Sequence, residues 1–253
     1  MKKSFSLFLL IIVLVYGCKE STIQPPDNTG NSDFYPASIG NYYFYNVSLY
    51  DSSGLIQSGI RKTYFVGDTI IVPTAYQIKV DTFQLSSQLI NHSYFRKTST
   101  GIFNYVDIDT NGFSSIVPDT LQGAISFDLE YRLLYQPLSL NQIWDVYKIT
   151  INLLFTQFEL FSLDAAVISK DSLTLSFQNS NVTKEVYKIE YKAKLVTDTT
   201  SSTTTYKVFA WIADGVGVIK WEGDSELINF FAGGNIYLPN TYVTEELFSY
   251  KIR

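Results

Sequence analysis

Residues 187–195 read Tyr-Lys-Ile-Glu-Tyr-Lys-Ala-Lys-Leu, and this stretch decides the fold class. Apolar side chains recur at every second position, with charged residues between them. A period of two places the apolar side chains on one face of a β-strand and the charged side chains on the other. The stretch therefore predicts a strand that packs against a core on one face and contacts solvent on the other.

The same alternation recurs on both sides of this strand. It is found in Ile60, Lys62, Tyr64 and Val66, in Tyr76, Ile78 and Val80, and in Phe248, Tyr250 and Ile252. Gly and Asn, which tolerate positive φ, mark hairpin turns at residues 51–54, 109–112 and 233–235. A Ser/Thr-rich loop at 197–205 joins the predicted strands 186–196 and 206–212. We therefore predict an all-β fold, an antiparallel meander that forms a curved half-open barrel or a two-lobed sandwich, with few short helices.

The composition excludes several classes of protein. The chain of 253 residues is 46% hydrophobic and 16% aromatic, and burial of this much apolar surface offsets the conformational entropy that keeps other chains disordered. One Cys and one His exclude an internal disulfide framework, a thiolate metal cluster and a multi-histidine zinc site. We therefore expect no cofactor.

No recognisable catalytic constellation is present either. His92 has no Gly-x-Ser-x-Gly nucleophile elbow to serve. The carboxylate pairs Asp107 with Asp109 and Asp128 with Glu130 are typical of a solvated strand face rather than of a glycosidase site. We therefore expect a protein that is not an enzyme.

The N-terminus predicts export. Two lysines at positions 2 and 3 precede an apolar run at 5–15, which is far shorter than the roughly 20 residues of a membrane-spanning helix. The run leads into Val15-Tyr16-Gly17-Cys18, which resembles the bacterial lipobox, where a small residue precedes a cysteine that receives acyl chains such as palmitate. The resemblance implies that residues 1–17 are a signal peptide and that Cys18 carries the lipid anchor.

Residues 18–33 are expected to form the lipidated Cys and a flexible tether, because the stretch is polar and contains Pro25-Pro26. The absence of Asp directly after Cys18 resembles outer-membrane lipoproteins, which implies the outer membrane, on its periplasmic face or at the cell surface. Loss of the two lysines of the signal leaves 17 basic and 24 acidic residues, a formal charge of −7. This charge disfavours nucleic acid and anionic lipid surfaces as partners.

Residues 34–253 are expected to form the all-β domain. They resemble a loose group of uncharacterised bacterial lipoproteins in two phrases, Phe34-Tyr35-Pro36 to Gly40-Asn41-Tyr42-Tyr43 near the start and residues 211–220 near the end. Some members of that group are similar to the half-open β-barrel of periplasmic lipoprotein carriers, whose concave sheet holds acyl chains. The resemblance implies a concave sheet with an apolar ligand, at the level of the fold alone.

Residues 35–43 and 135–144 resemble each other, since each combines an extended Pro segment, a tight turn and an aromatic strand. Two β lobes from a duplication would explain this echo, with a boundary near 122–134. One continuous curved sheet would explain the same spacing.

Asp107, Asp109 and Asn111 match the first half of a calcium loop, in which alternating oxygen ligands converge on a hard cation. The second half does not match, because Pro118 stands where a bidentate Glu should follow. A hairpin with an Asn-Gly turn is the favoured interpretation, and the three residues remain a weak calcium candidate.

Aromatic residues carry the remaining functional signal. Tyr43, Trp144, Phe209, Trp211 and Trp221 could line an apolar cavity or a sugar-binding platform, and ordinary core packing would use the same rings. The leading hypothesis is a lipid-anchored envelope protein that binds an apolar small molecule or a partner through an aromatic-lined concave face. The alternative is a cell-surface accessory lipoprotein that binds a glycan or a protein. A hydrolase that uses remote carboxylates is the third hypothesis.

Overall fold

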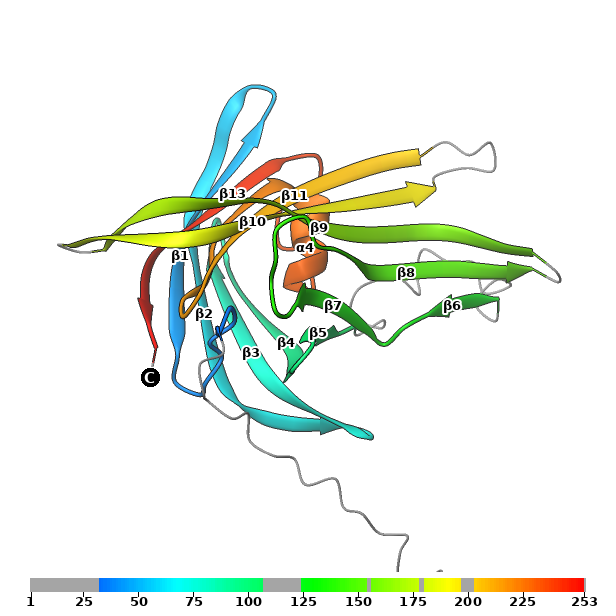
Figure 1. Cartoon of the computed structure of the whole chain (residues 1–253). Coiled ribbons are helices and arrows are strands. Elements are labelled where there is room, and N and C mark those ends of the chain that lie inside the picture. Colours follow the sequence, from blue (N-terminus) through cyan, green and yellow to red (C-terminus); the bar gives the residue numbers. More distant parts are fainter. Residues whose placement is uncertain (1–31, 107–123, 154–155, 178–179, 197–202, 253) are drawn as a thin grey trace, which may run out of the picture. The chain divides into compact units, whose positions relative to one another are not determined.

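The structure is a computed structural model that describes residues 32–106, 124–153, 156–177, 180–196 and 203–252. These residues form an all-β domain with one short helix, as the sequence predicts (Figure 1). The elements are β1 (Tyr42–Asp51), β2 (Gly54–Ile71), β3 (Thr74–Gln84), β4 (Gln88–Thr98), β5 (Gly101–Tyr105), β6 (Ile125–Phe127), β7 (Glu130–Tyr135), β8 (Ile143–Leu153), β9 (Thr156–Phe177), β10 (Ser180–Val196), β11 (Thr203–Ala213), β12 (Gly217–Asp224), α4 (Ser225–Ala232) and β13 (Tyr242–Lys251).

The strands join in one sheet, in the order β6-β8-β9-β10-β11-β12-β13-β1-β2-β3-β4-β5-β7. Each pairing is antiparallel, and most strands pair with their neighbours in the chain. The last strand, β13, pairs with the first, β1. Strands from both halves of the chain therefore share one continuous curved sheet, which confirms the curved form of the fold prediction and not the two-lobed sandwich.

The stretch that predicts the fold class lies in β10. Ile189, Tyr191 and Ala193 are at most 1% exposed, while Lys192 is half-buried and Lys194 is exposed. Their register against β11 is continuous over the whole stretch, and against β9 it is continuous from Ile189 onward, after a shift between Lys188 and Ile189. The period of two therefore predicts the strand and the buried face from Ile189 to Ala193, whereas Tyr187, before the register shift, is only half-buried.

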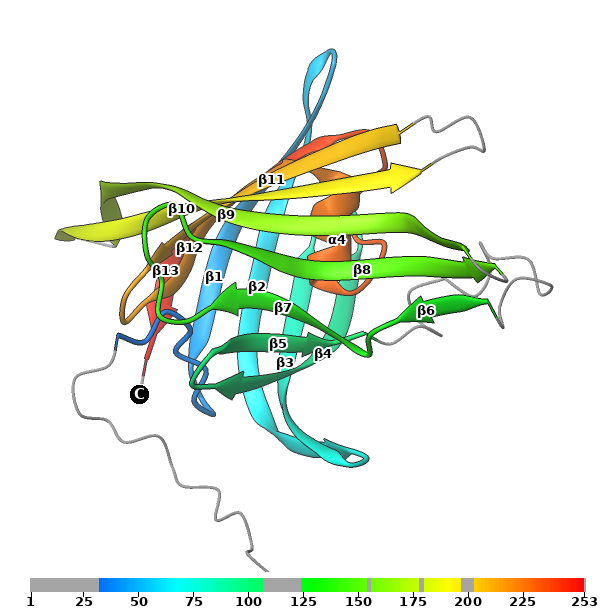
Figure 2. The same ribbon diagram turned by 45° about the vertical axis from the view of Figure 1, so that its right-hand side comes forward.

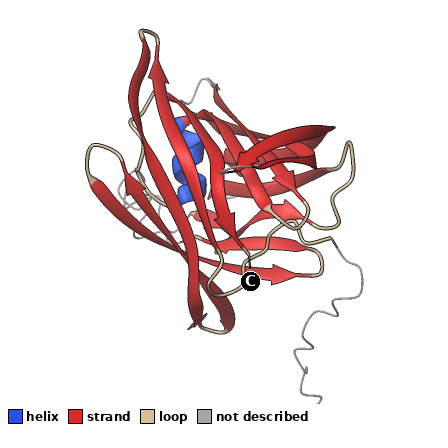
Figure 3. Ribbon diagram, turned by 90° about the vertical axis from the view of Figure 1, so that its left-hand side faces the viewer, coloured by secondary structure: helices blue, strands red, loops and turns tan. Residues whose placement is uncertain are grey.

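Helix α4 lies within the curve of the sheet (Figure 3). Its buried apolar side chains are Leu227, Ile228, Phe231 and Ala232, and they belong to the same core as the inner faces of the strands. The helix ends at Gly233, which adopts the left-handed conformation with φ 77° and donates its N–H to Asn229 O. The hairpin turn predicted at 233–235 is therefore wrong, because the glycine that tolerates positive φ here ends a helix instead.

The two edges of the sheet approach each other where β7 lies beside β8 (Figure 2). Among the described residues no backbone ladder joins these strands, and side chains connect them instead. Trp144 Nε1 donates to Arg132 O at 3.2 Å, and Tyr147 OH donates to Asp128 O at 2.9 Å. The sheet is therefore open in its backbone hydrogen bonds. Between β6 and β7, inside the boundary expected at 122–134, the chain passes from one edge to the other.

Candidate functional site

Three of the five predicted aromatic site residues lie on the inner face. Tyr43, Trp144 and Trp221 are 4%, 5% and 6% exposed. The Trp221 ring stacks on Phe231 of α4 with ring centroids 5.3 Å apart, so the helix occupies the space that a ligand would take. Tyr43 OH donates to Pro36 O at 2.7 Å. All three residues are therefore part of the packed core.

The other two, Phe209 and Trp211, lie on the outer face. They alternate along β11 with the fully buried Val208 and Ala210, and a strand directs successive side chains to opposite faces. The ammonium of Lys188 lies 4.5 Å from the Phe209 ring centroid and 4.7 Å from that of Trp211. The five aromatic residues therefore do not line one concave surface, which corrects the expectation from the sequence.

The inner face carries a network of four buried charges that the sequence pattern does not reveal. Arg61 of β2 contacts both carboxylates, with its Nε 3.0 Å from Asp81 Oδ1 and its Nη1 against Glu245 Oε2. Lys79 Nζ lies 3.2 Å from Asp81 Oδ2. Two cations and two carboxylates balance, and each of the four residues is at most 8% exposed.

Burial and the neighbouring charges shift the pKa values of Asp81 and Arg61. Burial alone would raise the pKa of Asp81, but Arg61, Lys79 and the Thr63 hydroxyl together lower it to about 2. Burial lowers the pKa of a guanidinium, yet Asp81 and Glu245 hold that of Arg61 well above its usual value. Asp81 and Arg61 are therefore ionised at neutral pH, and the contacts of the network connect β2, β3 and β13.

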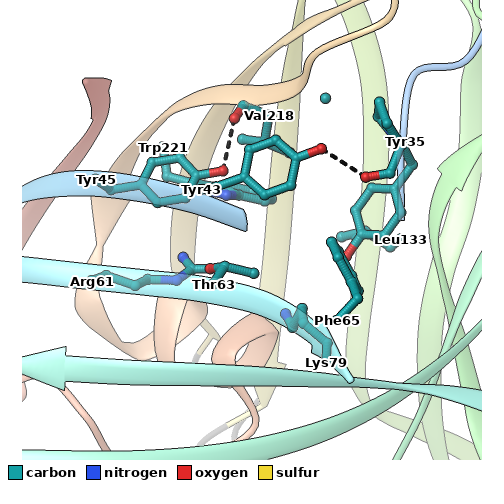
Figure 4. Close-up of a pocket in the computed structure, with 12 residues that line it drawn as sticks. Tyr35, Tyr43, Tyr45, Arg61, Thr63, Phe65, Lys79, Leu133, Val218 and Trp221 are labelled. Carbon is teal, nitrogen blue, oxygen red and sulfur yellow. Dashed lines mark hydrogen bonds between the residues drawn. The ribbon is translucent and has the colours of Figure 1, made fainter. Parts of the chain in front are cut away.

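The cavity beside this network is small. It is lined by Tyr35, Pro36, Tyr43, Tyr45, Arg61, Thr63, Phe65, Lys79, Leu133, Gly217, Val218 and Trp221. Figure 4 shows Tyr43 and Tyr45 with their hydroxyls bonded to backbone carbonyls, above Arg61 and Thr63 of the next strand. Its volume is about 40 Å³, which holds one or two water molecules. Pockets for small ligands measure roughly 300–1,000 Å³, so this cavity, as the described residues form it, has no room for an acyl chain.

A larger hollow lies at the end of the sheet where β1 turns into β2, and we call it the rim groove. Its volume is about 330 Å³. Four separate segments line it: Tyr50, Asp51 and Ser52, then Thr205 and Tyr206, then Asp224 and Glu226, and finally Asn240, Thr241 and Tyr242. Tyr50, Tyr242 and Asp224 stand directly opposite one another across β1, β13 and β12, so the sheet register fixes their spacing.

The carboxylates of the rim groove are fixed hydrogen-bond acceptors. Asp224 Oδ2 accepts the N–H of Lys207 at 2.6 Å. Glu226 Oε1 accepts the N–H of Asn240 at 2.7 Å, and the carboxylate stands in the first turn of α4, where the helix dipole favours negative charge. No basic residue is among those that line the groove. The groove therefore favours uncharged ligands rich in hydroxyl donors and disfavours anions.

The tyrosines of the groove combine a flat ring with a neutral hydroxyl. Tyr242 is 39% exposed on the outer face, and its OH donates to Glu222 Oε1 at 2.8 Å. Burial and the neighbouring Glu222 raise the pKa of Tyr242, and burial with Glu226 and Asp224 raises that of Tyr206. Both hydroxyls therefore stay protonated near neutral pH. No motif in the sequence identifies the groove, because four segments far apart in the chain form it.

Among the remaining predicted residues, His92 and Glu130 are described, and neither lines either cavity. Cys18 and the calcium candidates Asp107, Asp109 and Asn111 lie outside the described residues, and the described ranges contain no group of three or more residues that could hold a metal ion. His92 is exposed on β4. Glu130 forms a bidentate ion pair with Arg96 and accepts a hydrogen bond from the Tyr76 hydroxyl, so its carboxylate connects neighbouring strands of the sheet. Within the described part of the chain, no helix has the length and hydropathy of a membrane span.

Comparison with known proteins finds fold likeness alone. No family model and no curated protein matches the chain. Two solved structures resemble it, a proposed lipoprotein from Parabacteroides distasonis at 13% identity and a proposed exported protein with a YmcC-like fold from Bacteroides fragilis at 11%. Both have a TM-score of 0.44, and each comparison covers 87% of this chain and 99% of the other. These values assign neither a family nor a function to the chain.

Proposed function

We propose that this chain is a lipid-anchored envelope lipoprotein that binds a neutral glycan in the rim groove and is not an enzyme. The observation that carries the proposal is the groove itself, with its volume of about 330 Å³, its tyrosine rings and its fixed carboxylate acceptors. A flat ring packs against the apolar face of a pyranose, and carboxylate, amide and hydroxyl groups bond to the sugar hydroxyls. The lipobox supplies the anchor, and the charge of −7 argues against anionic glycans.

The hypothesis of an apolar ligand on the concave face has less support than glycan binding at the rim groove. It requires a large cavity on the concave face, where Tyr43, Trp144 and Trp221 are buried and the cavity beside the charge network measures about 40 Å³. A hydrolase also has less support, because Asp224 and Glu226 already accept backbone N–H groups and are held as acceptors. Binding at the rim therefore needs no rearrangement of the fold, whereas an acyl chain on the concave face would need one.

The experiment is a neutral-glycan array, followed by calorimetry with the glycan it selects, using the mature chain and Tyr242→Ala. We expect one-to-one binding that is insensitive to salt and at least tenfold weaker in the variant, a loss of about 1.4 kcal/mol, because the exposed ring no longer supports the sugar. Tyr64→Ala, which removes a half-buried outer-face ring from β2, is the matched control and should bind normally. Equal binding by Tyr242→Ala and the natural chain would contradict the assignment of the groove, and cleavage of the glycan would contradict the absence of enzyme activity.

A further inference from the structure

The turn between β2 and β3 exposes apolar side chains with no charge beside them. Val72 is 88% exposed and Ile70 is 72% exposed, the highest value and the third highest among the exposed large hydrophobic residues of the described chain. Pro73 between the strands is exposed as well. From Thr69 to Ile78 the sequence contains no charged residue. An exposed apolar tip of this kind marks a surface that contacts an apolar partner.

The domain begins at this same end of the sheet. Asp33 forms an ion pair with Lys97 near the end of β4, and its carbonyl accepts the N–H of Gly215 at 2.8 Å. The register of β3 and β4 pairs Gln77 with Phe95, so Lys97 stands two residues nearer the turn, at the level of Ala75. Ala75 in turn pairs with Ile70 across β2 and β3. The first residues of the domain and the apolar tip are therefore neighbours in register.

We propose that the β2–β3 turn inserts Ile70 and Val72 into the interface of the lipid bilayer to which Cys18 is anchored. This proposal rests on the lipid anchor of the proposed function. About 14 residues separate Cys18 from Asp33, and a chain of this length spans at most roughly 50 Å. The anchor thus holds the tip at high effective concentration near the bilayer, so two apolar side chains suffice for insertion that would be weak alone.

The charge of the mature chain favours insertion into zwitterionic rather than anionic membranes. A formal charge of −7 opposes binding to anionic headgroups, and the tip itself carries no cation. Insertion is therefore driven by apolar burial and occurs on zwitterionic lipid, with little dependence on salt. The rim groove lies at the opposite end of the 18-residue strand β2 from the inserted tip.

The test uses the full lipidated chain in phosphatidylcholine vesicles, with an environment-sensitive fluorophore on Val72→Cys. Lipidation blocks the sulfur of Cys18, the chain's one natural cysteine, so the new thiol is labelled alone. Ile90→Cys is the matched control, because Ile90 is 58% exposed and stands near the β3–β4 turn at the other end of the sheet. We expect the Val72→Cys label to shift to shorter wavelength and to lose at least half its intensity when the lipids carry a nitroxide quencher, and the control label to do neither.

Each other outcome overturns the proposal in a distinct way. A chain that floats with the vesicles while its position-72 label is not quenched retains the anchor and has no inserted tip. Equal quenching at positions 72 and 90 shows a domain that lies flat on the membrane. A spectral shift that appears without vesicles and grows with protein concentration shows that a second copy covers the tip. A chain that does not float with the vesicles contradicts the lipid anchor, and this proposal with it.

Discussion

At the scale of single residues, Arg61 shows why the alternation in β2 does not identify the buried face of that strand. Alternation in residues 60–66 predicts a strand correctly, but its apolar members Ile60, Tyr64 and Val66 lie on the outer face, and Arg61 and Thr63 lie inside. A period of two divides the side chains of a strand between two faces. When both faces carry apolar and polar residues, the period does not identify which face is buried. The charge network decides it here, because Arg61 finds its carboxylate partners on β3 and β13, far away in the chain.

Replacement of Asp81 by Asn tests this network through its pH dependence. The folded pKa of about 2 lies below the ordinary value of 3.8, so folding stabilises the ionised form. Its contribution, about 2 kcal/mol, is complete above pH 5 and is lost as the pH falls from about 4 to about 2. Near pH 7 we expect Asp81→Asn to lower the free energy of unfolding by about 3 kcal/mol or more, because two buried cations lose their partner.

The measurement is urea unfolding, followed by tryptophan fluorescence, between pH 7 and pH 2.5. The variant should lose less stability than the natural chain across the acid range, by about 2 kcal/mol. Asp68→Asn, which replaces an exposed carboxylate of β2, should keep the acid loss of the natural chain. Parallel acid profiles for the natural chain and Asp81→Asn would show that this carboxylate is not held ionised by the fold.

At the scale of elements, the turns are predictable in part. The turns of the two segments that resemble each other in sequence do have the same hydrogen bond: Asn41 donates its N–H to Ser38 O at 3.0 Å, and Gln142 donates its N–H to Ser139 O at 3.2 Å. Gly40 and Asn141 both have positive φ, of 90° and 61°. Helix α4 is not predicted, because a segment of eight residues is too short for its apolar pattern to distinguish a helix from a strand. Its place inside the sheet follows from burial of Phe231 and its neighbours, which no local signal encodes.

Replacement of Phe231 by Ala tests whether α4 is a structural part of the core. Phe231 is 7% exposed and contacts the rings of Tyr191 and Trp221, so its loss leaves a cavity. We expect the free energy of unfolding to fall by about 3–5 kcal/mol in chemical denaturation. Phe158→Ala on β9, where the ring is 52% exposed, should change it by no more than about 0.5 kcal/mol. A Phe231→Ala variant as stable as the natural chain would mean that the helix is a movable lid over an inner site.

At the scale of the whole domain, the two ends of β2 differ in chemistry. Its first end adjoins the rim groove, with tyrosines, carboxylates and an amide, and its last end is the uncharged tip with Ile70 and Val72. The sequence predicts the all-β class, because alternation is local. It does not predict the groove, because the pairing of β13 with β1 brings Tyr50 and Tyr242 together from opposite ends of the chain. Local sequence patterns do not predict which strands far apart in the chain pair with each other.

A packed inner face and recognition at the rim groove together predict what the protein carries and what it binds. Native mass spectrometry of the mature chain from Lys19 to Arg253, made in a bacterial periplasm, measures both, before and after addition of the glycan selected on the array. We expect the bare protein mass at first, then a one-to-one glycan complex that Tyr242→Ala fails to form. A stoichiometric extra mass at the start that extracts into organic solvent as lipid would show instead that the inner face opens to hold a ligand, because a cavity of about 40 Å³ cannot hold a lipid.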